Sequence, residues 1–367
     1  MRKIISIFGT RPEAIKMAPL VKALEADNRF ESKVIVTAQH REMLDQVLKI
    51  FAIVPDYDLN IMSLGQTLTE ITTKVLLDLQ PILIEEKPDM ILVHGDTTTT
   101  FAAATAAFYQ QIPIGHVEAG LRTWNKNSPY PEEANRQLTD VLADLYFAPT
   151  QQSRRNLLEE NHRAQDIFIT GNTAIDAMKY TIQADYKNFA LSDGDHKHVI
   201  VTMHRRENLG EPMKQVFRAL KRIALEFPQV VFIFPMHKNP QVRQLAQSFL
   251  DNLENVQLIE PLDVVDFHNF MAKSYLILSD SGGVQEEAPS LGVPVLVLRD
   301  TTERPEGIQA GTLKLIGTQE ETVYRETKHL LVDEQEHQKM AQAKNPYGDG
   351  KASQHIIEAI VDYFQRK

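Results

Sequence analysis

Three acidic residues occupy positions where a side chain can take up or release a proton during a reaction. Asp96 in "HGDTTTT" and Glu118 in "HVEAGLRT" each follow an apolar segment, and Glu132 in "YPEEANR" opens a segment with helical periodicity. Ligands of open α/β sheets bind beyond the carboxyl ends of the strands. Because Asp96 and Glu118 stand at such ends, they are candidates for general acid and base catalysis.

Each acid also has a structural interpretation. Asp96 is equally well placed as the N-cap of a helix beginning "TTTTFAAA", and an acid such as Glu132 in a first helical turn stabilises the helix dipole. A carboxylate at the end of an apolar strand, such as Glu118, costs several kcal/mol unless it is paired or functional. The candidate partners are Arg11, Arg122, Arg136, His116 and His204. A structural ion-pair network is therefore the alternative to catalysis.

The segment "SDSGGVQEEAPSLG" indicates a phosphate site. Ser281, Gly282 and Gly283 open a helix there, so backbone amides and the positive helix end can receive a phosphate. Glu287 follows about one turn later, where a carboxylate can accept two hydrogen bonds from a ribose diol. The alternative is a serine cap followed by glycines that ease a tight turn.

The segment "FGTRPEAIK" places an arginine and a lysine where the first strand meets the first helix. Thr10 followed by Glu13 forms a capping box, and Pro12 suits a first helical turn. These residues explain why a helix begins here, but they do not explain Arg11.

The composition of the 367-residue chain restricts its partners and cofactors. A net charge of −10 disfavours nucleic acid and anionic membranes as partners. The absence of cysteine excludes disulfides, thiolate metal sites and a cysteine nucleophile. The sequence also lacks the motifs G-x-G-x-x-G, G-x-x-x-x-G-K-[ST] and H-E-x-x-H, so we expect no cofactor, neither NAD nor a metal. No apolar segment has the length of a signal peptide or membrane span, which predicts a cytoplasmic protein.

Apolar segments rich in β-branched residues alternate with segments of helical periodicity along the chain, which predicts an α/β fold with doubly wound parallel sheets. The predicted strands of the first half are "KIISIF", "KVIVT", "MILVH", "IPIGHV", "LYFAP" and "IFIT". Those of the second half are "VIVTM", "VVFIF", "VQLI", "YLILS", "VPVLVL" and "LKLI". We expect two Rossmann-like domains facing each other across a cleft, namely residues 1–172 with a C-terminal helix at 353–367, and residues 173–352.

The ordered motifs of the chain resemble those of the bacterial non-hydrolysing UDP-N-acetylglucosamine 2-epimerases. They are "FGTRPEAIKMAPL", "VTAQHREMLDQVL", "HGDTTTT", "HVEAGLRT", "PEEANR", "HRREN", "SDSGGVQEEAPSLG" and "RDTTERPEG". The resemblance runs from the first strand to about residue 310, and the ordered set is far more specific than any single motif. It implies a glycosyltransferase-B-like architecture, UDP-N-acetylglucosamine and UDP as ligands, and a homodimer.

The resemblance also implies roles for the matching residues. The implied catalytic residues are Asp96, Glu118, Glu132 and His204, without an assignment of the acids to either face of the sugar. The implied neighbours of the diphosphate and sugar are Arg11, Lys16, His204 and Arg304. The implied contacts to uracil, phosphate and ribose are Phe267, Ser281, Gly282, Gly283 and Glu287.

Some members of this family bind a second substrate molecule as an activator. Gln39 and His237 match positions of that allosteric site. Glu42 and Gly65, in contrast, stand where some members carry Gln and Arg. Activation by substrate is therefore left open.

The implied reaction interconverts UDP-N-acetylglucosamine and UDP-N-acetylmannosamine through elimination of UDP, a 2-acetamidoglucal and re-addition of UDP. It would supply a precursor of bacterial surface polysaccharide. A glycosyltransferase of the same architecture would fit the nucleotide site equally well, but it would need an acceptor pocket in place of convergent carboxylates. A hydrolysing epimerase that releases free N-acetylmannosamine ranks third, and a nucleotide-sugar sensor without turnover ranks fourth.

Overall fold

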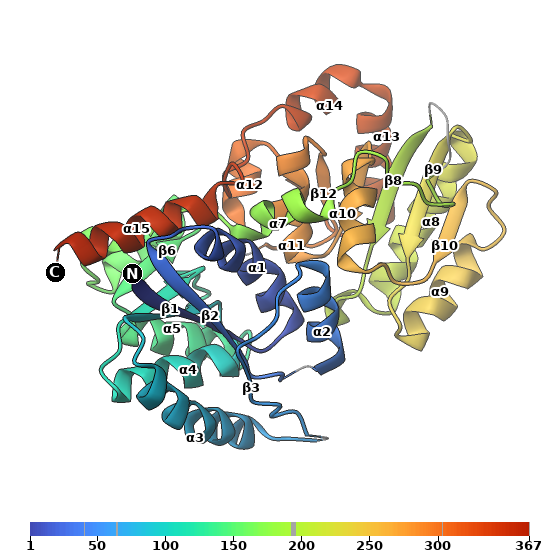
Figure 1. Cartoon of the computed structure of the whole chain (residues 1–367). Helices are drawn as coiled ribbons and strands as arrows, with labels where there is room; N and C mark the ends of the chain where they lie inside the picture. Colours follow the sequence, from blue (N-terminus) through green and yellow to red (C-terminus); the bar gives the residue numbers. More distant parts are fainter. Residues whose placement is uncertain (40, 64, 192–195, 303, 367) are drawn as a thin grey trace. The chain divides into compact units, whose positions relative to one another are not determined.

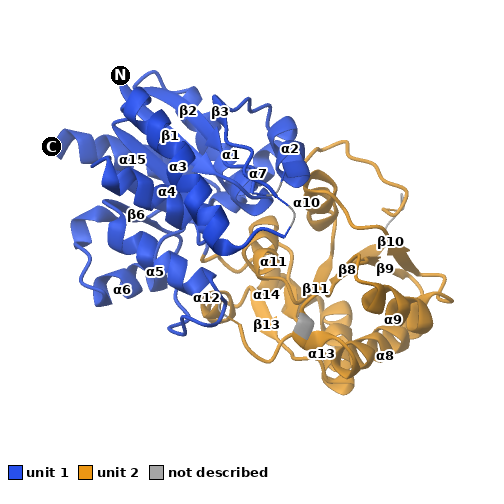
Figure 2. Ribbon diagram, turned by 90° about the horizontal axis from the view of Figure 1, so that it is seen from below, with its two compact units in different colours: residues 1–180, 347–367 blue, residues 181–346 orange. Residues whose placement is uncertain are grey.

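The chain folds into two compact units, each built on a parallel β-sheet. The structure is a computed structural model, and it describes residues 1–39, 41–63, 65–191, 196–302 and 304–366. Unit 1 comprises Met1–Tyr180 and Tyr347–Lys367, and unit 2 comprises Thr181–Pro346 (Figure 2). Strands and helices alternate in both units, so the predicted α/β fold class is confirmed.

The described part of unit 1 contains a seven-stranded sheet in the order β3-β2-β1-β4-β5-β6-β7. Its strands are β1 (Arg2–Phe8), β2 (Phe30–Val36), β3 (Tyr57–Asp58), β4 (Met90–His94), β5 (Ile114–Val117), β6 (Leu145–Ala148) and β7 (Ile167–Ile169). All neighbouring strands are parallel. The sequence pattern does not predict β3, because this strand is two residues long and lies in an acidic segment.

Helices cover both faces of the unit 1 sheet (Figure 1). They are α1 (Arg11–Glu25), α2 (Arg41–Ile50), α3 (Leu68–Glu86), α4 (Thr98–Tyr109), α5 (Glu132–Leu142), α6 (Gln151–Glu159), α7 (Thr173–Thr181) and α15 (Ala352–Arg366), with a 3-10 turn η1 (Ala164–Asp166). Side chains alternate along β1, so Ile4 and Phe8 join the core with α1, α2 and α15, whereas Ile5 and Ile7 join the core with α3 and α4. Burial on both faces explains why the strands read as continuous apolar segments.

The described part of unit 2 contains a six-stranded parallel sheet in the order β10-β9-β8-β11-β12-β13. Its strands are β8 (Lys197–Thr202), β9 (Val230–Pro235), β10 (Val256–Ile259), β11 (Leu276–Ser279), β12 (Val295–Val297) and β13 (Leu313–Leu315). Its helices are α8 (Glu211–Glu226), α9 (Pro240–Leu250), α10 (Val264–Ala272), α11 (Gly282–Glu287), α12 (Pro305–Ala310), α13 (Glu320–Val332) and α14 (Glu334–Ala341), with 3-10 turns η2 (Arg206–Asn208) and η3 (Ala288–Leu291).

Both sheets reverse their strand order at one position, between β1 and β4 in unit 1 and between β8 and β11 in unit 2. Doubly wound sheets bind ligands at such a switch point, beyond the carboxyl ends of the strands. The loops after these four strands are therefore where functional side chains are expected in each unit.

The chain re-enters unit 1 beside the place where it leaves. The amide of Asn172 donates to the carbonyl of Tyr347 at 2.7 Å, and a Cβ on Gly171 would lie 3.1 Å from the Cα of Gly348. Asp176 accepts hydrogen bonds from the first amides of α15, at 3.1 and 2.9 Å. These contacts bring residues 173–180 and 347–352 into unit 1, whereas the boundaries expected from the sequence assign them to the second domain.

The last residue of the expected C-terminal helix, Lys367, lies outside the described residues. Within the described chain, every helix is either too short or too polar to cross a lipid bilayer.

Candidate active site

The loops after β4 and β5 and the start of α5 bring the three predicted acids together in unit 1. Asp96 lies two residues after β4, Glu118 follows β5 directly, and Glu132 is the first residue of α5. Burial raises the pKa of Asp96, the Arg136 guanidinium opposes this effect, and the charges of Glu118 and Glu132 raise the pKa further. Glu118 and Glu132 therefore both lie within electrostatic reach of Asp96.

Asp96 is bound by a cation and does not cap a helix. Its Oδ2 lies 2.6 Å from Nη2 of Arg136. The side chain of Thr97, one residue later, accepts a hydrogen bond from the amide of Thr100 at 3.1 Å and caps α4. The helix-cap interpretation of Asp96 is therefore wrong, because the helix begins one residue further on. Glu132 does stand in a first helical turn, so its helix-dipole interpretation remains alongside the catalytic one.

Glu118 is held by groups from distant parts of unit 1. Its side chain is 11% exposed and forms an ion pair with Nζ of Lys16. Nδ2 of Asn172 donates to its Oε2 at 3.2 Å, and Nε2 of His94 lies 3.7 Å from the same oxygen. The backbone of Glu118 has a φ of 67°, in the left-handed region that residues other than glycine adopt infrequently.

A fully buried ion-pair network supports the two loops that carry Asp96 and Glu118. Nδ1 of His116 lies 2.6 Å from Oδ1 of Asp140, whose Oδ2 lies 2.6 Å from Nη2 of Arg122. His116 and Arg122 therefore pair with Asp140, although the sequence suggested them as partners of Glu118. Burial acts to raise the pKa of Asp140, but the charges and hydrogen bonds of His116 and Arg122 outweigh it and hold the pKa below its usual value.

The same network fixes backbone groups in both loops. Nε2 of His116 lies 2.8 Å from the carbonyl oxygen of Gly95, and the amide of Gly120 donates to Asp140 at 3.2 Å. Each ring nitrogen of His116 therefore faces an oxygen of unit 1. The network thus ties the loop after β4 to the loop after β5.

The turn between β1 and α1 is anchored to the start of α4 by Glu13. This buried carboxylate accepts from the amide of Thr10 at 2.8 Å, as the predicted capping box requires. It also accepts from the hydroxyls of Thr97 and Thr100, at 2.8 and 3.0 Å. Burial raises its pKa against the effect of these hydrogen bonds. Arg11, the first residue of α1, is half-buried on this anchored turn.

In unit 2, the predicted phosphate and ribose residues gather at the start of α11. Ser281 occupies the N-cap position, but within the described chain its side chain forms no cap hydrogen bond, so the serine-cap interpretation is not supported. A Cβ on Gly282 would lie 2.7 Å from Nη1 of Arg304, and one on Gly283 would lie 3.5 Å from Oε1 of Glu287. The predicted residues Ser281, Gly282, Gly283, Glu287 and Arg304 are thus neighbours.

Two residues that the sequence did not single out hold this cluster. Oε1 of Glu286 lies 2.7 Å from Nε of Arg304. Nε2 of His268, a buried residue of α10, lies 3.7 Å from Oε2 of Glu287. Phe267 precedes His268 in the chain and is half-buried.

His204 follows β8 and is positioned by a buried aspartate. Its Nδ1 lies 3.2 Å from Oδ1 of Asp280, which also accepts the backbone amides of His204 and Arg205, each at 3.0 Å. Burial acts to raise the pKa of Asp280, but hydrogen bonds from His204, Arg205 and Asn208 outweigh it and lower the pKa. The His204 side chain is 45% exposed, so it is accessible for contact with a ligand.

The two residues of the expected allosteric site belong to different units. The exposed His237 stacks on His204, with ring centroids 6.0 Å apart. Gln39 accepts a hydrogen bond from the hydroxyl of Thr99 at 2.9 Å.

A detectable signal existed for two of the residues that the sequence analysis missed. His94 ends an apolar strand, and Asp280 directly follows one, as Glu118 does. Asn172 offered no comparable signal, because it lies in a loop 54 residues from Glu118.

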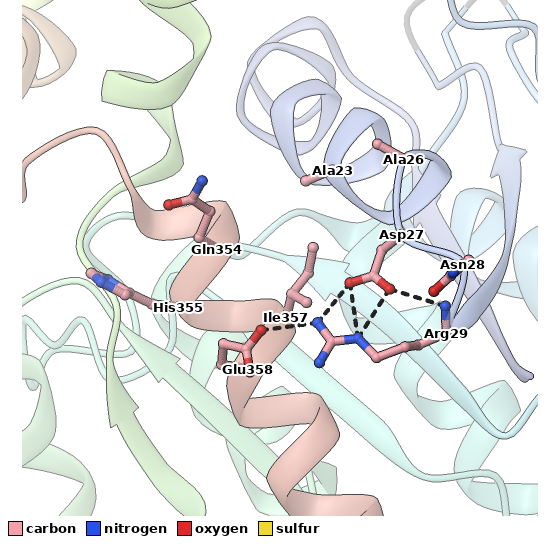
Figure 3. Close-up of a pocket in the computed structure, with 9 residues that line it drawn as sticks. All are labelled: Ala23, Ala26, Asp27, Asn28, Arg29, Gln354, His355, Ile357 and Glu358. Carbon is pink, nitrogen blue, oxygen red and sulfur yellow. Dashed lines mark hydrogen bonds and ion pairs between the residues drawn. The ribbon is translucent and has the colours of Figure 1, made fainter.

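The surface hollow drawn in Figure 3 lies between the end of α1 and helix α15 and measures about 760 Å³. Arg29 bridges Asp27 and Glu358 there, at 2.6 and 2.9 Å. None of the predicted functional residues lines this hollow, so its size does not identify the functional site.

Two parallel doubly wound sheets, each with candidate functional side chains beyond its switch point, define an α/β protein of the glycosyltransferase-B-like class. The sequence profile of the UDP-N-acetylglucosamine 2-epimerase family matches residues 22–361, and the chain belongs to this family. The resemblance to its bacterial non-hydrolysing members is confirmed.

Relatives of known structure or function cover nearly the whole chain. A Bacillus subtilis protein named UDP-N-acetylglucosamine 2-epimerase is 59% identical, covering 99% of this chain and 96% of that protein. The Staphylococcus aureus protein MnaA, solved with UDP, is 56% identical with a TM-score of 0.91, over 100% of this chain and 97% of that chain. A Neisseria meningitidis UDP-GlcNAc 2-epimerase bound to UDP-GlcNAc is 50% identical with a TM-score of 0.87, over 98% of this chain and 100% of that chain.

Proposed function

We propose that the chain reversibly epimerises C2 of UDP-N-acetylglucosamine and so produces UDP-N-acetylmannosamine. Membership of the epimerase family and the relatives solved with UDP and UDP-GlcNAc support this proposal. The observation that carries it is the convergence of Asp96, Glu118 and Glu132 beyond the switch point of unit 1. A sugar transferase would instead need an acceptor pocket there.

The proposed route is an anti elimination followed by re-addition. The C2 hydrogen is not next to a carbonyl group, so a side-chain base cannot remove it directly at a useful rate. Cleavage of the C1–O bond releases UDP with the bonding electrons and builds positive charge on the ring, while a base removes the C2 proton to leave a 2-acetamidoglucal. UDP then adds back to C1 as an acid protonates C2 from the opposite face. Inversion therefore needs acid and base groups on both faces.

Asp96 and Glu118 have the contrasting environments that an acid and a base require. The raised pKa of Asp96 favours its protonated form, whereas the ion pair with Lys16 favours the Glu118 carboxylate. We assign Glu118 the role of base towards UDP-N-acetylglucosamine and Asp96 the role of acid, with the roles exchanged in the reverse reaction. The negative charge of Glu132 adds to the effects that raise the pKa of Asp96.

The remaining predicted residues bind the nucleotide sugar in this proposal. Arg11, Lys16, His204 and Arg304 contact the diphosphate and sugar, and His204 also belongs to the catalytic set. Phe267 lies near the uracil, and Ser281, Gly282, Gly283 and Glu287 bind phosphate and ribose. Fixed cations and helix amides stabilise departing UDP electrostatically, as donors in an oxyanion hole do.

The test of the proposal is an incubation with UDP-N-acetylglucosamine in D2O, followed by proton NMR. We expect a nucleotide-bound manno product that carries deuterium at C2. Free N-acetylmannosamine with UDP would instead identify a hydrolysing epimerase. Unchanged substrate would refute turnover and favour a glycosyltransferase or a sensor.

Amide variants test the three acids one at a time. Glu118→Gln and Asp96→Asn should each lower kcat by about 10²- to 10⁴-fold, because each removes a proton-transfer group. Glu132→Gln should also lower kcat, because Asp96 loses a negative charge that raises its pKa. Asp45→Asn is the control, since Asp45 forms a surface ion pair with Arg41 on α2. An acid whose amide variant keeps kcat within about threefold of wild type, less than about 1 kcal/mol of barrier, has no part in the reaction.

The proposed route requires no hydride carrier and no metal ion. We therefore expect turnover to be unchanged after dialysis against EDTA and to need no added NAD. A rate that is lost on dialysis and restored by a divalent cation or by NAD would contradict the elimination route as written.

We also propose a homodimer. Exposed apolar side chains on three helices of unit 1, among them Leu77 of α3, Phe108 of α4 and Val141 of α5, would be covered by a second copy. Light scattering during size-exclusion chromatography should give twice the chain mass, and Val141→Asp should shift it towards the monomer. A monomeric wild type at micromolar concentration would refute the dimer.

The proposed site of action is the bacterial cytoplasm, where the product would supply a precursor of surface polysaccharide. Deletion of the gene should remove N-acetylmannosamine-derived sugar from a surface polymer, and an unchanged polymer would refute this role.

Substrate activation through Gln39 and His237 is a further part of the proposal. It predicts a sigmoidal rate curve that His237→Ala makes hyperbolic, and a hyperbolic wild-type curve would exclude it.

A further inference from the structure

One buried histidine beside the candidate acids has no role in the mechanism described so far. His94 is the last residue of β4, and its side chain is 4% exposed. Neither of its ring nitrogens has a hydrogen-bond partner within the described residues. Buried polar atoms are nearly always paired, so an unpaired buried histidine requires an explanation.

The position of His94 relative to Glu118 offers that explanation. Its Nε2 lies 3.7 Å from Oε2 of Glu118, which is too long for a hydrogen bond but within reach of a small side-chain movement. The same oxygen forms the ion pair with Lys16 and accepts from Nδ2 of Asn172 at 3.2 Å. The Asn172 amide is itself fixed, because its Oδ1 accepts from the amide of Ala174 at 2.9 Å.

His94 is uncharged in this environment. Burial lowers its pKa to about 3, although the Glu118 carboxylate acts to raise it, and Lys16 and His116 lower it further. These three titratable groups come from the loop after β5, from α1 and from β5. A neutral imidazole still has one N–H group. It can therefore donate to a carboxylate without placing a second positive charge beside Lys16.

We propose that His94 is a positioning residue that binds Glu118 when Lys16 turns to the anionic diphosphate of the substrate. Nε2–H of His94 then donates to Oε2 of Glu118, and together with Asn172 it keeps the carboxylate ionised and oriented. The step exchanges one hydrogen-bond partner for another, and no covalent bond changes. The inference rests on the proposed function, because it requires a ligand that draws Lys16 away from Glu118.

Three substitutions of His94 distinguish a hydrogen-bond donor from a space-filling side chain. His94→Gln keeps an N–H group near the position of Nε2, His94→Asn has an N–H group on a shorter side chain, and His94→Phe fills the space without a donor. We expect the Asn and Phe substitutions to lower kcat by about 10- to 100-fold, with KM changed less than about threefold. They should also move the acidic limb of the kcat–pH profile to higher pH, because Glu118 loses a donor to its charged form. The Gln substitution should retain most of kcat and the wild-type limb.

His198 provides a matched control in unit 2. It is a buried histidine on β8 whose pKa is also lowered, first by burial, and it lies outside the candidate site. His198→Gln and His198→Phe should change the thermal midpoint without moving the pH limb of kcat.

Equal kcat values and pH limbs in the Gln and Asn variants of His94 would overturn the inference, as would wild-type behaviour of all three variants. If the Phe variant does not fold, the two amide variants decide the question. Turnover of the wild-type protein in D2O distinguishes a failure of the proposed function from a failure of the role of His94. A wild-type protein without turnover refutes the proposed function, whereas turnover that is unaffected by these substitutions refutes only the role of His94.

Discussion

Each unit contains a histidine–aspartate pair near the carboxyl end of its sheet, and the pairs differ in their surroundings. In unit 1, Nδ1 of His116 lies 2.6 Å from Oδ1 of Asp140, and both side chains are fully buried. In unit 2, Nδ1 of His204 lies 3.2 Å from Oδ1 of Asp280, and the aspartate is buried while the histidine is almost half exposed. The first pair is enclosed by protein, and the second leaves its histidine accessible.

Residue types alone therefore do not distinguish a supporting histidine–aspartate pair from a ligand-binding one. The second ring nitrogen of His116 donates to the Gly95 carbonyl at 2.8 Å, so both of its nitrogens are engaged within unit 1. The ring of His204 stacks instead on the exposed His237. We therefore expect substitutions in the first pair to act mainly on folding stability and those in the second pair to act mainly on turnover.

The largest effect is expected for Asp140→Asn. The amide leaves the buried guanidinium of Arg122 without its carboxylate and weakens the contact with His116, so the free energy of unfolding should fall by about 3–5 kcal/mol. Urea denaturation measures this loss. Asp362→Asn, which removes an exposed ion pair with Arg366, is the control and should cost about 0–1 kcal/mol. A loss below about 1 kcal/mol for Asp140→Asn would contradict the supporting role of the pair.

Smaller effects on turnover and stability are expected for substitutions of the two histidines, His204 and His116. His204→Gln should lower kcat/KM by about 10- to 100-fold and change the free energy of unfolding by less than about 0.5 kcal/mol, because the side chain is partly exposed. His116→Gln should instead lower the free energy of unfolding by more than about 1 kcal/mol, since a fully buried side chain that contacts both Asp140 and the Gly95 carbonyl is lost. Steady-state kinetics and denaturation of both variants test the contrast, which fails if the two lose stability equally.

The smallest expected effect is a change in the free energy of unfolding that has opposite signs for substitutions of Asp280 and Asp96. The lowered pKa of Asp280 means that its carboxylate stabilises the fold above its ordinary value of 3.8, and this contribution is lost as the pH falls through the folded-state value. The raised pKa of Asp96 means that its charged form costs stability at neutral pH, and this cost disappears as the pH falls through its folded-state value.

At pH 7, therefore, Asp280→Asn should lower the free energy of unfolding by about 1 kcal/mol, and Asp96→Asn should raise it by a similar amount. Both differences from wild type should shrink towards pH 3. Denaturation curves at pH 7, 5 and 3 measure them, and a change of the same sign for both variants at pH 7 would refute the contrast.

The strands were the most predictable part of the fold. All twelve predicted segments contain strands, because a parallel strand covered on both faces, such as β4, is a continuous run of apolar residues. The edge strand β3 has two residues and a half-exposed surface, so it leaves no such pattern.

The site was predictable in its positions but less so in its contacts. Asp96 and Glu118 were recognisable because they follow buried strands. The partner of Glu118 could not be predicted, because Lys16 is 102 residues away and contacts Glu118 only through the packing of α1 against the sheet. The adjacent acids Glu132 and Glu133 also look alike in the sequence. Glu133 is the one that is buried and accepts the amides of Thr123 and Trp124, each at 3.0 Å.

The close approach of Gly171 to Gly348 makes unit 2 an insertion within a discontinuous host domain. Lys179 also contacts Gly350, so the two chain ends that flank residues 181–346 lie close together in unit 1. Residues 181–346 can thus be replaced by a short Gly/Ser linker that closes the host into one uninterrupted polypeptide. Such a shortened protein would contain the three acids and Lys16 but would lack the nucleotide-binding residues assigned to unit 2. It would allow the folding of the proton-transfer residues to be studied apart from nucleotide binding.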